Sequence, residues 1–330
     1  MCLLRRRRAL LGGVVAVVVV GLPLVARGQP GTRVYRIGIL EPVPQARNAA
    51  NLDAFRAGLR ELGYVEGRNL VIEYRSADGL ADRFPALAAE LLRSRVDVIV
   101  TRGTPAALAA RKATTTVPIL MATMGAPPEL VASMHSPGGN MTGLTTYSTE
   151  LVGKRIELLK ELVPALSRVG LLHNMDNPVA AREWEETKSA VLALGAAAEL
   201  LDVRSEADIT AAFEQIATRR VDGLLVAADG LTQMHQALIL DRVARIRLPA
   251  AYPSREFVEA GGLIAYAVRY PALYRRLAGL IDKILKGAKP AELPIEQPTR
   301  FELVVNLKTA KALALTVPRS ILLRADEVIE

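Results

Sequence analysis

Polar residues follow several apolar runs of this chain, at positions where the strands of a parallel sheet would end. The segment Gly103-Thr104-Pro105-Ala106 comes just after the apolar run Val96–Val100. Threonine is a favoured residue before a helix, and proline is favoured at the first helical position. The amide groups beyond them would attract a carboxylate or another acceptor, aided by the helix dipole. The segment therefore predicts either an anion-binding helix terminus or a simple helix cap.

Other candidate binding residues follow later apolar runs, because ligands of open α/β sheets lie beyond the carboxyl ends of the strands. Asn174, Asp229 and Arg255 would face the Thr104 segment if the two halves of the chain meet at these edges. Asp229 could then hold an ammonium group, while the helix terminus or Arg255 holds an acid group. Thr123 and Tyr266 also stand at predicted strand ends, and we include both among the candidate ligand-binding residues.

Signals for catalysis, metals or cofactors are weak in this sequence. Asp176 and Asp229 could form a catalytic carboxylate pair, although loop acids and helix caps explain such residues more often. The three histidines, His135, His173 and His235, lack the spacing of metal ligands. Nucleotide-binding glycine motifs and the G-x-S-x-G elbow are both missing. We expect no cofactor, no metal site and no enzyme activity.

A regular alternation of strand-like and helix-like segments would position these residues. From Val34 the pattern predicts strands at Val34–Leu40, Asn69–Tyr74, Val96–Val100 and Val117–Met121, with helices at Ala50–Leu62, Phe84–Leu92 and Ala106–Lys112. After the Gly- and Pro-containing segment 136–140 the rhythm restarts. Strands are expected at Arg168–His173, Ala197–Val203, Gly223–Ala227 and Leu263–Ala267, and helices at Leu151–Leu162, Ala180–Leu194, Ile209–Thr218, Leu231–Ile246 and Pro271–Leu285. This order predicts an α/β protein with two doubly wound parallel-sheet lobes.

Two side-chain groups on one predicted helix are assigned structural roles. We expect Trp184 to pack against the protein interior. We expect Glu183, Glu185 and Glu186 to form a single solvated face.

The first 28 residues are typical of an export signal. Arg5–Arg8 precede the uncharged apolar run Ala9–Ala26, and small residues stand before a cleavage site after Gly28. An uncleaved membrane anchor is the alternative, since about 18 apolar residues can span a bilayer. Cys2, the only cysteine, precedes this run. We therefore expect a periplasmic protein whose mature form is free of cysteine.

The net charge of +8 owes much to that N-terminal segment. Five of the 42 basic residues lie in it with no acidic residue, which leaves 37 basic against 34 acidic residues and a balance of +3. This balance gives no electrostatic argument for nucleic-acid binding.

Ordered segments along the chain resemble the substrate-binding proteins of ABC importers, in the branch that includes tryptophan- and tyrosine-type binders. They include AFRAGLRELGYVEGRNLVIEYR (54–75), PGGNMTGLTTYSTEL (137–151), KRIELLKELVP (154–164), REFVEAGGLIAY (255–266), PTRFELVVNLKTAKALALTVP (298–318) and LLRADEVIE (322–330). The resemblance covers residues 33–330.

The resemblance implies a type I-like periplasmic binding fold whose two lobes close over a ligand. It implies lobe one at 33–146 plus 268–297 and lobe two at 147–267 plus 298–330, with the chain crossing near 142–147, 266–269 and 296–301. It also places Thr104-Pro105-Ala106 and the loops holding Asn174, Asp229 and Tyr266 at the cleft. Relatives often carry Gly-Asp-Pro after the fourth strand, whereas this chain has no acid in 123–127. An amine-binding acid at that place is therefore missing.

Together these observations predict an exported, monomeric receptor that captures a small polar ligand, with an amino acid or related compound as one candidate. The resemblance implies an ABC importer permease as its partner. A ligand sensor for a membrane signalling protein is the main alternative, and an enzyme working in the cleft is another. A sugar-type repressor would need a DNA-reading helix-turn-helix where this chain has its export signal.

Overall fold

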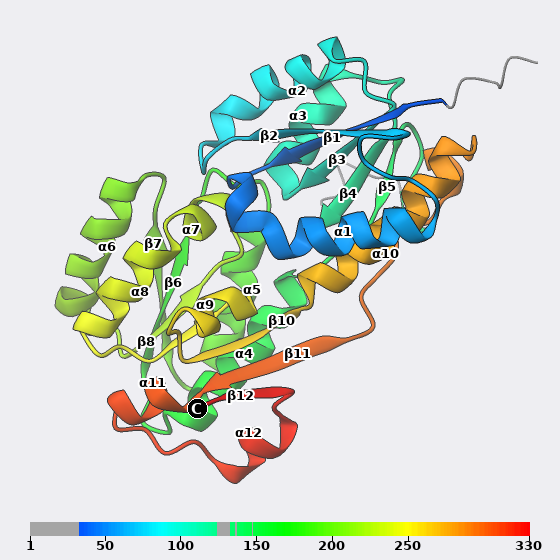
Figure 1. The fold of residues 1–330 in the computed structure, drawn as a ribbon. Coiled ribbons are helices and arrows are strands. Elements are labelled where there is room, and N and C mark those ends of the chain that lie inside the picture. The colour runs from blue at the N-terminus through cyan, green and yellow to red at the C-terminus, as the bar shows by residue number, and fades with distance from the viewer. Residues whose placement is uncertain (1–32, 124–132, 136, 147) are drawn as a thin grey trace, which may run out of the picture. The chain divides into compact units, whose positions relative to one another are not determined.

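Two sheets of mainly parallel strands carry the fold of this computed structural model (Figure 1). The structure describes residues 33–123, 133–135, 137–146 and 148–330. The predicted export signal and the segment 124–127 lie outside the described residues. Residues Val34–Glu330 form one compact unit.

The first sheet has five parallel strands in the order β2-β1-β3-β4-β5. Their bounds are β1 (Tyr35–Glu41), β2 (Leu70–Ser76), β3 (Val98–Arg102), β4 (Ile119–Thr123) and β5 (Met141–Gly143). Helices α2 (Phe84–Arg93) and α3 (Thr104–Ala113) pack on one face, and α1 (Ala49–Glu61) and α10 (Tyr270–Leu285) on the other. The inner strands β1, β3 and β4 are buried on both faces, which explains their apolar runs, whereas the edge strand β2 is only partly buried.

The second sheet has seven strands in the order β12-β11-β10-β9-β8-β6-β7. Its strands are β6 (Arg168–His173), β7 (Ala197–Asp202), β8 (Gly223–Val226), β9 (Ala250–Tyr252), β10 (Ile264–Val268), β11 (Phe301–Asn306) and β12 (Glu327–Ile329). All neighbours are parallel except β10 and β11, which run antiparallel with Tyr266 opposite Leu303. The sheet is therefore mixed, unlike the purely parallel one that we expected.

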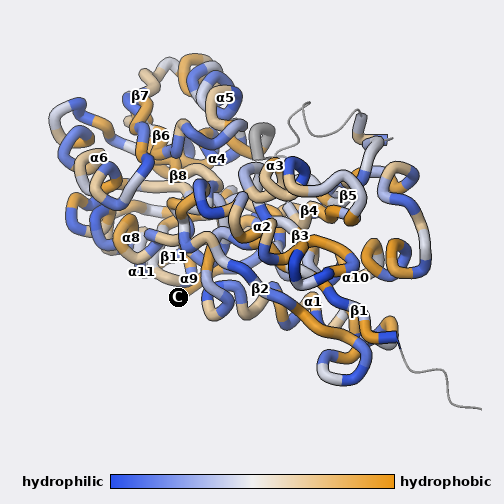
Figure 2. Tube along the Cα trace, turned by 90° about the horizontal axis from the view of Figure 1, so that it is seen from above, coloured by the Kyte–Doolittle hydropathy of each residue, from blue (hydrophilic) through white to orange (hydrophobic). Residues whose placement is uncertain are grey.

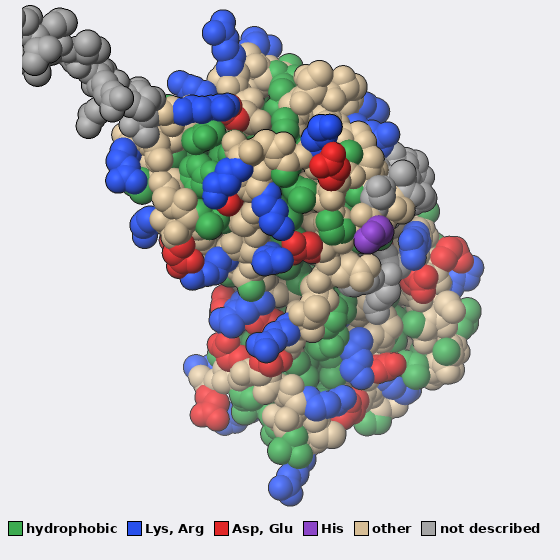
Figure 3. All heavy atoms as spheres, turned by 90° about the vertical axis from the view of Figure 1, so that its right-hand side faces the viewer, with side chains coloured by type: hydrophobic (Ala, Val, Ile, Leu, Met, Phe, Trp, Pro, Cys, Tyr) green, Lys and Arg blue, Asp and Glu red, His purple; other side chains and the backbone are tan. Residues whose placement is uncertain are grey.

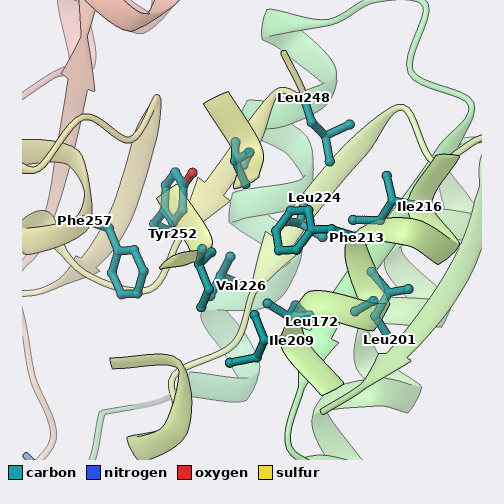
Figure 4. Close-up of a cluster of buried hydrophobic side chains, with 14 of the residues drawn as sticks. Leu172, Leu201, Ile209, Phe213, Ile216, Leu224, Val226, Leu248, Tyr252 and Phe257 are labelled. Carbon is teal, nitrogen blue, oxygen red and sulfur yellow. The ribbon is translucent and has the colours of Figure 1, made fainter. Parts of the chain in front are cut away.

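Helices cover both faces of this second sheet as well. Its helices are α4 (Ser148–Leu162), α5 (Ala180–Ala193), α6 (Glu206–Arg219), α7 (Gly230–Met234), α8 (Gln236–Arg245), α9 (Arg255–Glu259), α11 (Leu307–Ala312) and α12 (Arg319–Arg324). On one face, Phe213 and Ile216 of α6 pack with Leu172, Leu224 and neighbouring strand residues (Figure 4). Three short 3-10 turns, Gln45–Asn48, Ala81–Arg83 and Pro290–Glu292, complete the described elements.

The hydropathy of the chain follows this layering. Hydrophobic colour runs along strands such as β1 and β3, whereas the helices alternate between hydrophobic and hydrophilic residues (Figure 2). This alternation is what an amphipathic helix on a buried sheet requires. Within the described part of the chain, no helix combines the length and the apolar character needed to cross a membrane.

The predicted α/β fold class is confirmed, with differences in detail. The predicted helix Leu231–Ile246 is two helices, because the backbone of His235 leaves the α region between α7 and α8. Trp184 packs against the core as predicted. Glu183 does not share a solvated face: it is buried, and its Oε2 lies 3.0 Å from Nε2 of the buried His173.

The lobe boundaries remain a prediction. The strands of the first sheet and α10 fall within the ranges expected for lobe one, and the strands of the second sheet fall within those for lobe two except for Val268, the last residue of β10.

Candidate functional site

A cavity lies where the carboxyl ends of strands from both sheets meet. It encloses about 690 Å³ of space free of protein atoms, part of it open to solvent. In each sheet the strand order reverses between two neighbours, β1 and β3 in the first and β6 and β8 in the second. Such switch points open a crevice where ligands of α/β proteins bind. Residues within three positions after these four strands line the cavity, including Pro42, Gly103, Asn174 and Asp229.

The start of α3 forms the wall on the side of the first sheet. The helix begins at Thr104, and its N-cap is Gly103 with φ 81°. We had expected Thr104 as the N-cap and Pro105 as the first helical residue. Each instead stands one position further into the helix. In this turn the amide of Ala107 donates a hydrogen bond of 3.2 Å to the carbonyl oxygen of Gly103. Because helical N–H groups point toward the N-terminus, the first turn presents its amide edge to the cavity.

Asp229 anchors the wall on the side of the second sheet. It is the N-cap of α7, and its Oδ1 accepts a hydrogen bond of 2.8 Å from Leu231 N. Its Oδ2 accepts a second bond of 2.8 Å from Nδ2 of Asn177, which also lines the cavity. The buried carboxylate is therefore held in one orientation and keeps lone pairs for a further donor.

Asn174 and Thr123 complete the predicted residues that line the cavity. Oδ1 of Asn174 accepts a hydrogen bond from the amide of Asp176. No hydrogen bond engages Nδ2 of Asn174 among the described residues, so this group can donate to a ligand. Both residues are almost fully buried, and Thr123 ends strand β4 of the first sheet.

A buried arginine, Arg102, also lines the cavity and was not predicted. The guanidinium of Arg102 lies 4.7 Å from the ring centre of Tyr270, and its Nη1 lies 3.8 Å from Oε2 of Glu41. Burial, the largest single effect, would lower the pKa of Arg102, but Glu41 together with the nearby tyrosines and Glu256 outweighs it, so the pKa is raised. Burial also raises the pKa of the Glu41 carboxyl, and Arg102 opposes that shift. Arg102 therefore stays positively charged, and the Glu41 carboxylate beside it balances this charge.

The sequence contained a signal for this pair. Strands β1 and β3 are parallel neighbours with Leu40 opposite Thr101, so the next residues, Glu41 and Arg102, lie side by side. Opposite charges at the ends of two buried strands favour an ion pair at the switch point of the sheet.

Three predicted binding residues do not line the cavity. Ala106 is buried in the core between α2, α3 and the first sheet. Tyr266 packs against Phe301, with ring centres 5.8 Å apart. Arg255 instead joins three carboxylates: its nitrogens lie 2.8 Å from Glu259, 3.0 Å from Glu302 and 2.5 Å from Glu327. This network ties α9 to β11 and β12.

The acids considered for catalysis are not arranged as a pair. Asp176 has an exposed side chain that forms an ion pair of 2.9 Å with Arg204. Asp229 serves as the helix cap described above. Among the described residues, no group of three or more His, Cys, Asp and Glu side chains could hold a metal ion.

Charges of both signs occupy the surface of the described residues. In the face shown in Figure 3, Lys and Arg side chains occur with Asp and Glu among them.

Comparison with known proteins agrees with this geometry. Residues 36–329 match the family model described as ABC transporter substrate binding protein. A tyrosine-binding protein of Clostridioides difficile (strain R20291) is 24% identical over 279 residues, which cover 84% of this chain and 80% of the relative.

Solved structures agree in fold. An ABC domain in complex with L-Trp from Streptococcus pneumonia superposes with a TM-score of 0.83 at 27% identity, covering 90% of this chain and 100% of that one. A conserved domain protein from Vibrio cholerae gives a TM-score of 0.84 at 26% identity, with the same coverage. A leucine-binding protein of Thermotoga maritima shares the fold at 13% identity and a TM-score of 0.56 over 78% of this chain and 77% of that one. The resemblance found in the sequence is thereby confirmed, and the chain belongs to the family of ABC transporter substrate-binding proteins.

Proposed function

We propose that this protein is an exported receptor that captures an amino acid or a related small polar compound between its two lobes. The observation that carries the proposal is the cavity itself, which is lined by strand ends of both sheets. A ligand that contacts both walls favours the form in which they lie close together. The L-Trp complex and the tyrosine-binding relative make aromatic amino acids the first candidates.

Each wall offers a different chemistry to such a ligand. The amide edge of α3, with Thr104, would hold a carboxylate, since helix N-termini favour anions. On the opposite wall, Asp229 and Asn174 would hold a donor group such as an ammonium. The faces of Phe84 and Tyr270, which line the same cavity, would pack against the ligand body.

The remaining steps of transport rest on family membership. We propose that residues 1–28 direct export to the periplasm and are removed after Gly28, and that the monomeric receptor delivers its ligand to an importer permease. A sensory role beside a membrane signalling protein would use the same cavity. Permease genes beside the gene for this protein would favour import.

Mass spectrometry of compounds released from the purified protein, followed by titration calorimetry, tests the binding role. We expect one amino acid or a close relative to be retained and to raise the melting temperature. Asp229→Asn should weaken its binding by about tenfold, because the charge that holds the ammonium is lost. The fold should survive, since asparagine caps helices as well as aspartate does.

Asp241→Asn is the matched control, because Asp241 forms an exposed ion pair with Arg245 on α8. Its affinity should equal that of the unaltered protein. If no compound is retained and none of the twenty amino acids stabilises the protein, the proposed function is wrong. If Asp229→Asn binds as tightly as the unaltered protein, the role of Asp229 is wrong.

A further inference from the structure

A second cavity adjoins the first and is lined by residues of both lobes. It encloses about 390 Å³ of space free of protein atoms, part of it open to solvent. Arg102 and Gln233 line both cavities, so the two meet at these side chains. We call the second cavity the inner chamber; Asn51 and Glu256 are among its other lining residues.

Asn51 presents a buried oxygen without a hydrogen-bond partner. Its side chain donates from Nδ2 to Oδ1 of Asn48 at 2.8 Å, and Nη1 of Arg102 lies 3.4 Å from the same oxygen. A guanidinium only donates, so the Asn48 group that faces it must be the oxygen. Asn51 must then turn its nitrogen to Asn48, and its Oδ1 is left without a partner among the described residues. Asn51 is only 5% exposed, so this oxygen is costly to leave unpaired.

Two further side chains of the inner chamber also hold a buried oxygen without a hydrogen-bond partner. Oε2 of Glu256 and Oε1 of Gln233 are buried atoms without a hydrogen-bond partner in the described part of the chain. Both side chains belong to short helices of the second lobe, α9 and α7. Glu256 is an acceptor in any orientation because it carries a carboxylate, whereas the amide of Gln233 can turn either its oxygen or its nitrogen into the chamber.

The two arginines of the chamber have partners of their own. Nη1 of Arg47 lies 2.5 Å from the carbonyl oxygen of Met234 and 3.3 Å from that of Gln233. Arg102 is held by Glu41, Asn48 and the Tyr270 ring. Both guanidinium groups are thus held in place, and the Glu256 and Asn51 oxygens are the buried acceptors of the described lining that still lack a donor.

We propose that the inner chamber binds a hydrogen-bond-donating group, an ammonium or a hydroxyl, at the distal end of the captured ligand. This inference rests on the proposed function, because the head of the ligand would occupy the first cavity. Glu256, Asn51 and Gln233 then select ligands whose far end carries a donor over ligands of equal length with an apolar end. Burying an apolar end there would leave these acceptors unpaired, which is how polar sites reject analogues that lack a donor.

Two matched ligand pairs test the proposal by titration calorimetry with the full-length protein. L-lysine is compared with L-norleucine, which lacks the distal amine, and L-tyrosine with L-phenylalanine, which lacks the hydroxyl. We expect the donor-bearing member of one pair to bind about tenfold more tightly than its partner. The lysine pair reports an ammonium site, and the tyrosine pair a hydroxyl site.

Glu256→Leu should reduce that preference to less than about threefold, because the carboxylate acceptor is removed. Glu259→Leu, on the same helix, is the control: Glu259 bonds to Arg255 and does not line the chamber. It should leave the preference unchanged. If amino acids bind but neither pair shows a preference, the chamber holds only water and the inference fails while the receptor function stands. A preference that survives Glu256→Leu also refutes the inference. If no amino acid binds at all, the proposed function and the inference fail together.

Discussion

Replacing Gly230 by alanine should weaken ligand binding while leaving the fold intact. A Cβ atom at Gly230 would lie 2.7 Å from Cβ of Pro42, closer than carbon atoms in contact. Gly230 follows β8 of the second sheet and Pro42 follows β1 of the first, so the contact joins the two walls of the cavity. The positive-φ residues do not include Gly230, so alanine can adopt its backbone conformation.

The expected loss follows from the cost of this overlap. Forcing one methyl group into a packed contact costs about 1–3 kcal/mol. The overlap disappears when the walls separate, so the cost falls on the form that holds the ligand. A penalty of this size raises Kd by about 5- to 150-fold.

Calorimetry with the amino acid that stabilises the protein most gives Kd, and urea unfolding without ligand gives the free energy of unfolding. Gly279→Ala, where nothing lies within 4 Å of the added atom, is the control. It should leave Kd unchanged and add about 0.5–1 kcal/mol of stability, as expected for alanine in a helix interior. An unchanged Kd for Gly230→Ala would refute the reasoning. So would a loss of unfolding free energy as large as the loss of binding.

Two further predictions concern charges. Arg102→Met should cost about 3 kcal/mol at pH 8, because it leaves the Glu41 carboxylate buried without its cation; the folded pKa of Glu41, already raised by burial, rises further. A carboxyl whose folded pKa lies above its unfolded pKa stabilises the fold while it is protonated, and this stability is lost as pH rises through the folded pKa. The free energy of unfolding that Arg102→Met loses, measured by urea unfolding, should therefore be smaller at pH 5 than at pH 8. Glu161→Gln should cost less than about 1 kcal/mol at pH 7, since its ion pair with Arg324 is partly exposed. Hydrogen bonding from Ser320 lowers the pKa of Glu161, so the unaltered protein should lose this advantage as pH falls below about 4.5.

Each charge prediction has an outcome that contradicts it. Equal destabilisation of Arg102→Met at pH 5 and pH 8 would show that Glu41 does not titrate between them. For Glu161, a difference between variant and unaltered protein that persists at pH 3 would show that the carboxylate is not the cause. Glu185→Gln, which alters an exposed acid on α5, should show neither effect.

Long periodic segments were predictable because their pattern extends over several turns or a whole strand. Strand β6 was predicted with its bounds, and helix α10 within one residue at its start. Short elements such as β5, β9 and α12 have three to six residues. They were missed because such lengths hold less than two full periods of a helix or alternation.

The strand ends alone predicted which residues lie together, while their role in binding stays a prediction. Thr104, Asn174 and Asp229 share one cavity because the carboxyl ends of parallel strands meet at one edge. Arg255 also follows a strand, yet its side chain turns to carboxylates at 259, 302 and 327. Side-chain direction depends on partners distant in sequence, which a local pattern does not contain.

Residues after 269 complete both halves of this molecule. Helix α10 covers the first sheet beside α1, more than 200 positions earlier in the chain, and β11 and β12 form the edge of the second sheet. A growing polypeptide that has reached residue 269 therefore has the five strands of the first sheet but lacks helix α10, and the second sheet still has an open edge at β10. Contacts between segments so far apart in sequence form slowly, because the chain between them must first lose conformational entropy. Either half can complete its hydrophobic core only when synthesis is nearly finished. A premature stop before residue 270 therefore leaves two incomplete cores rather than one finished lobe.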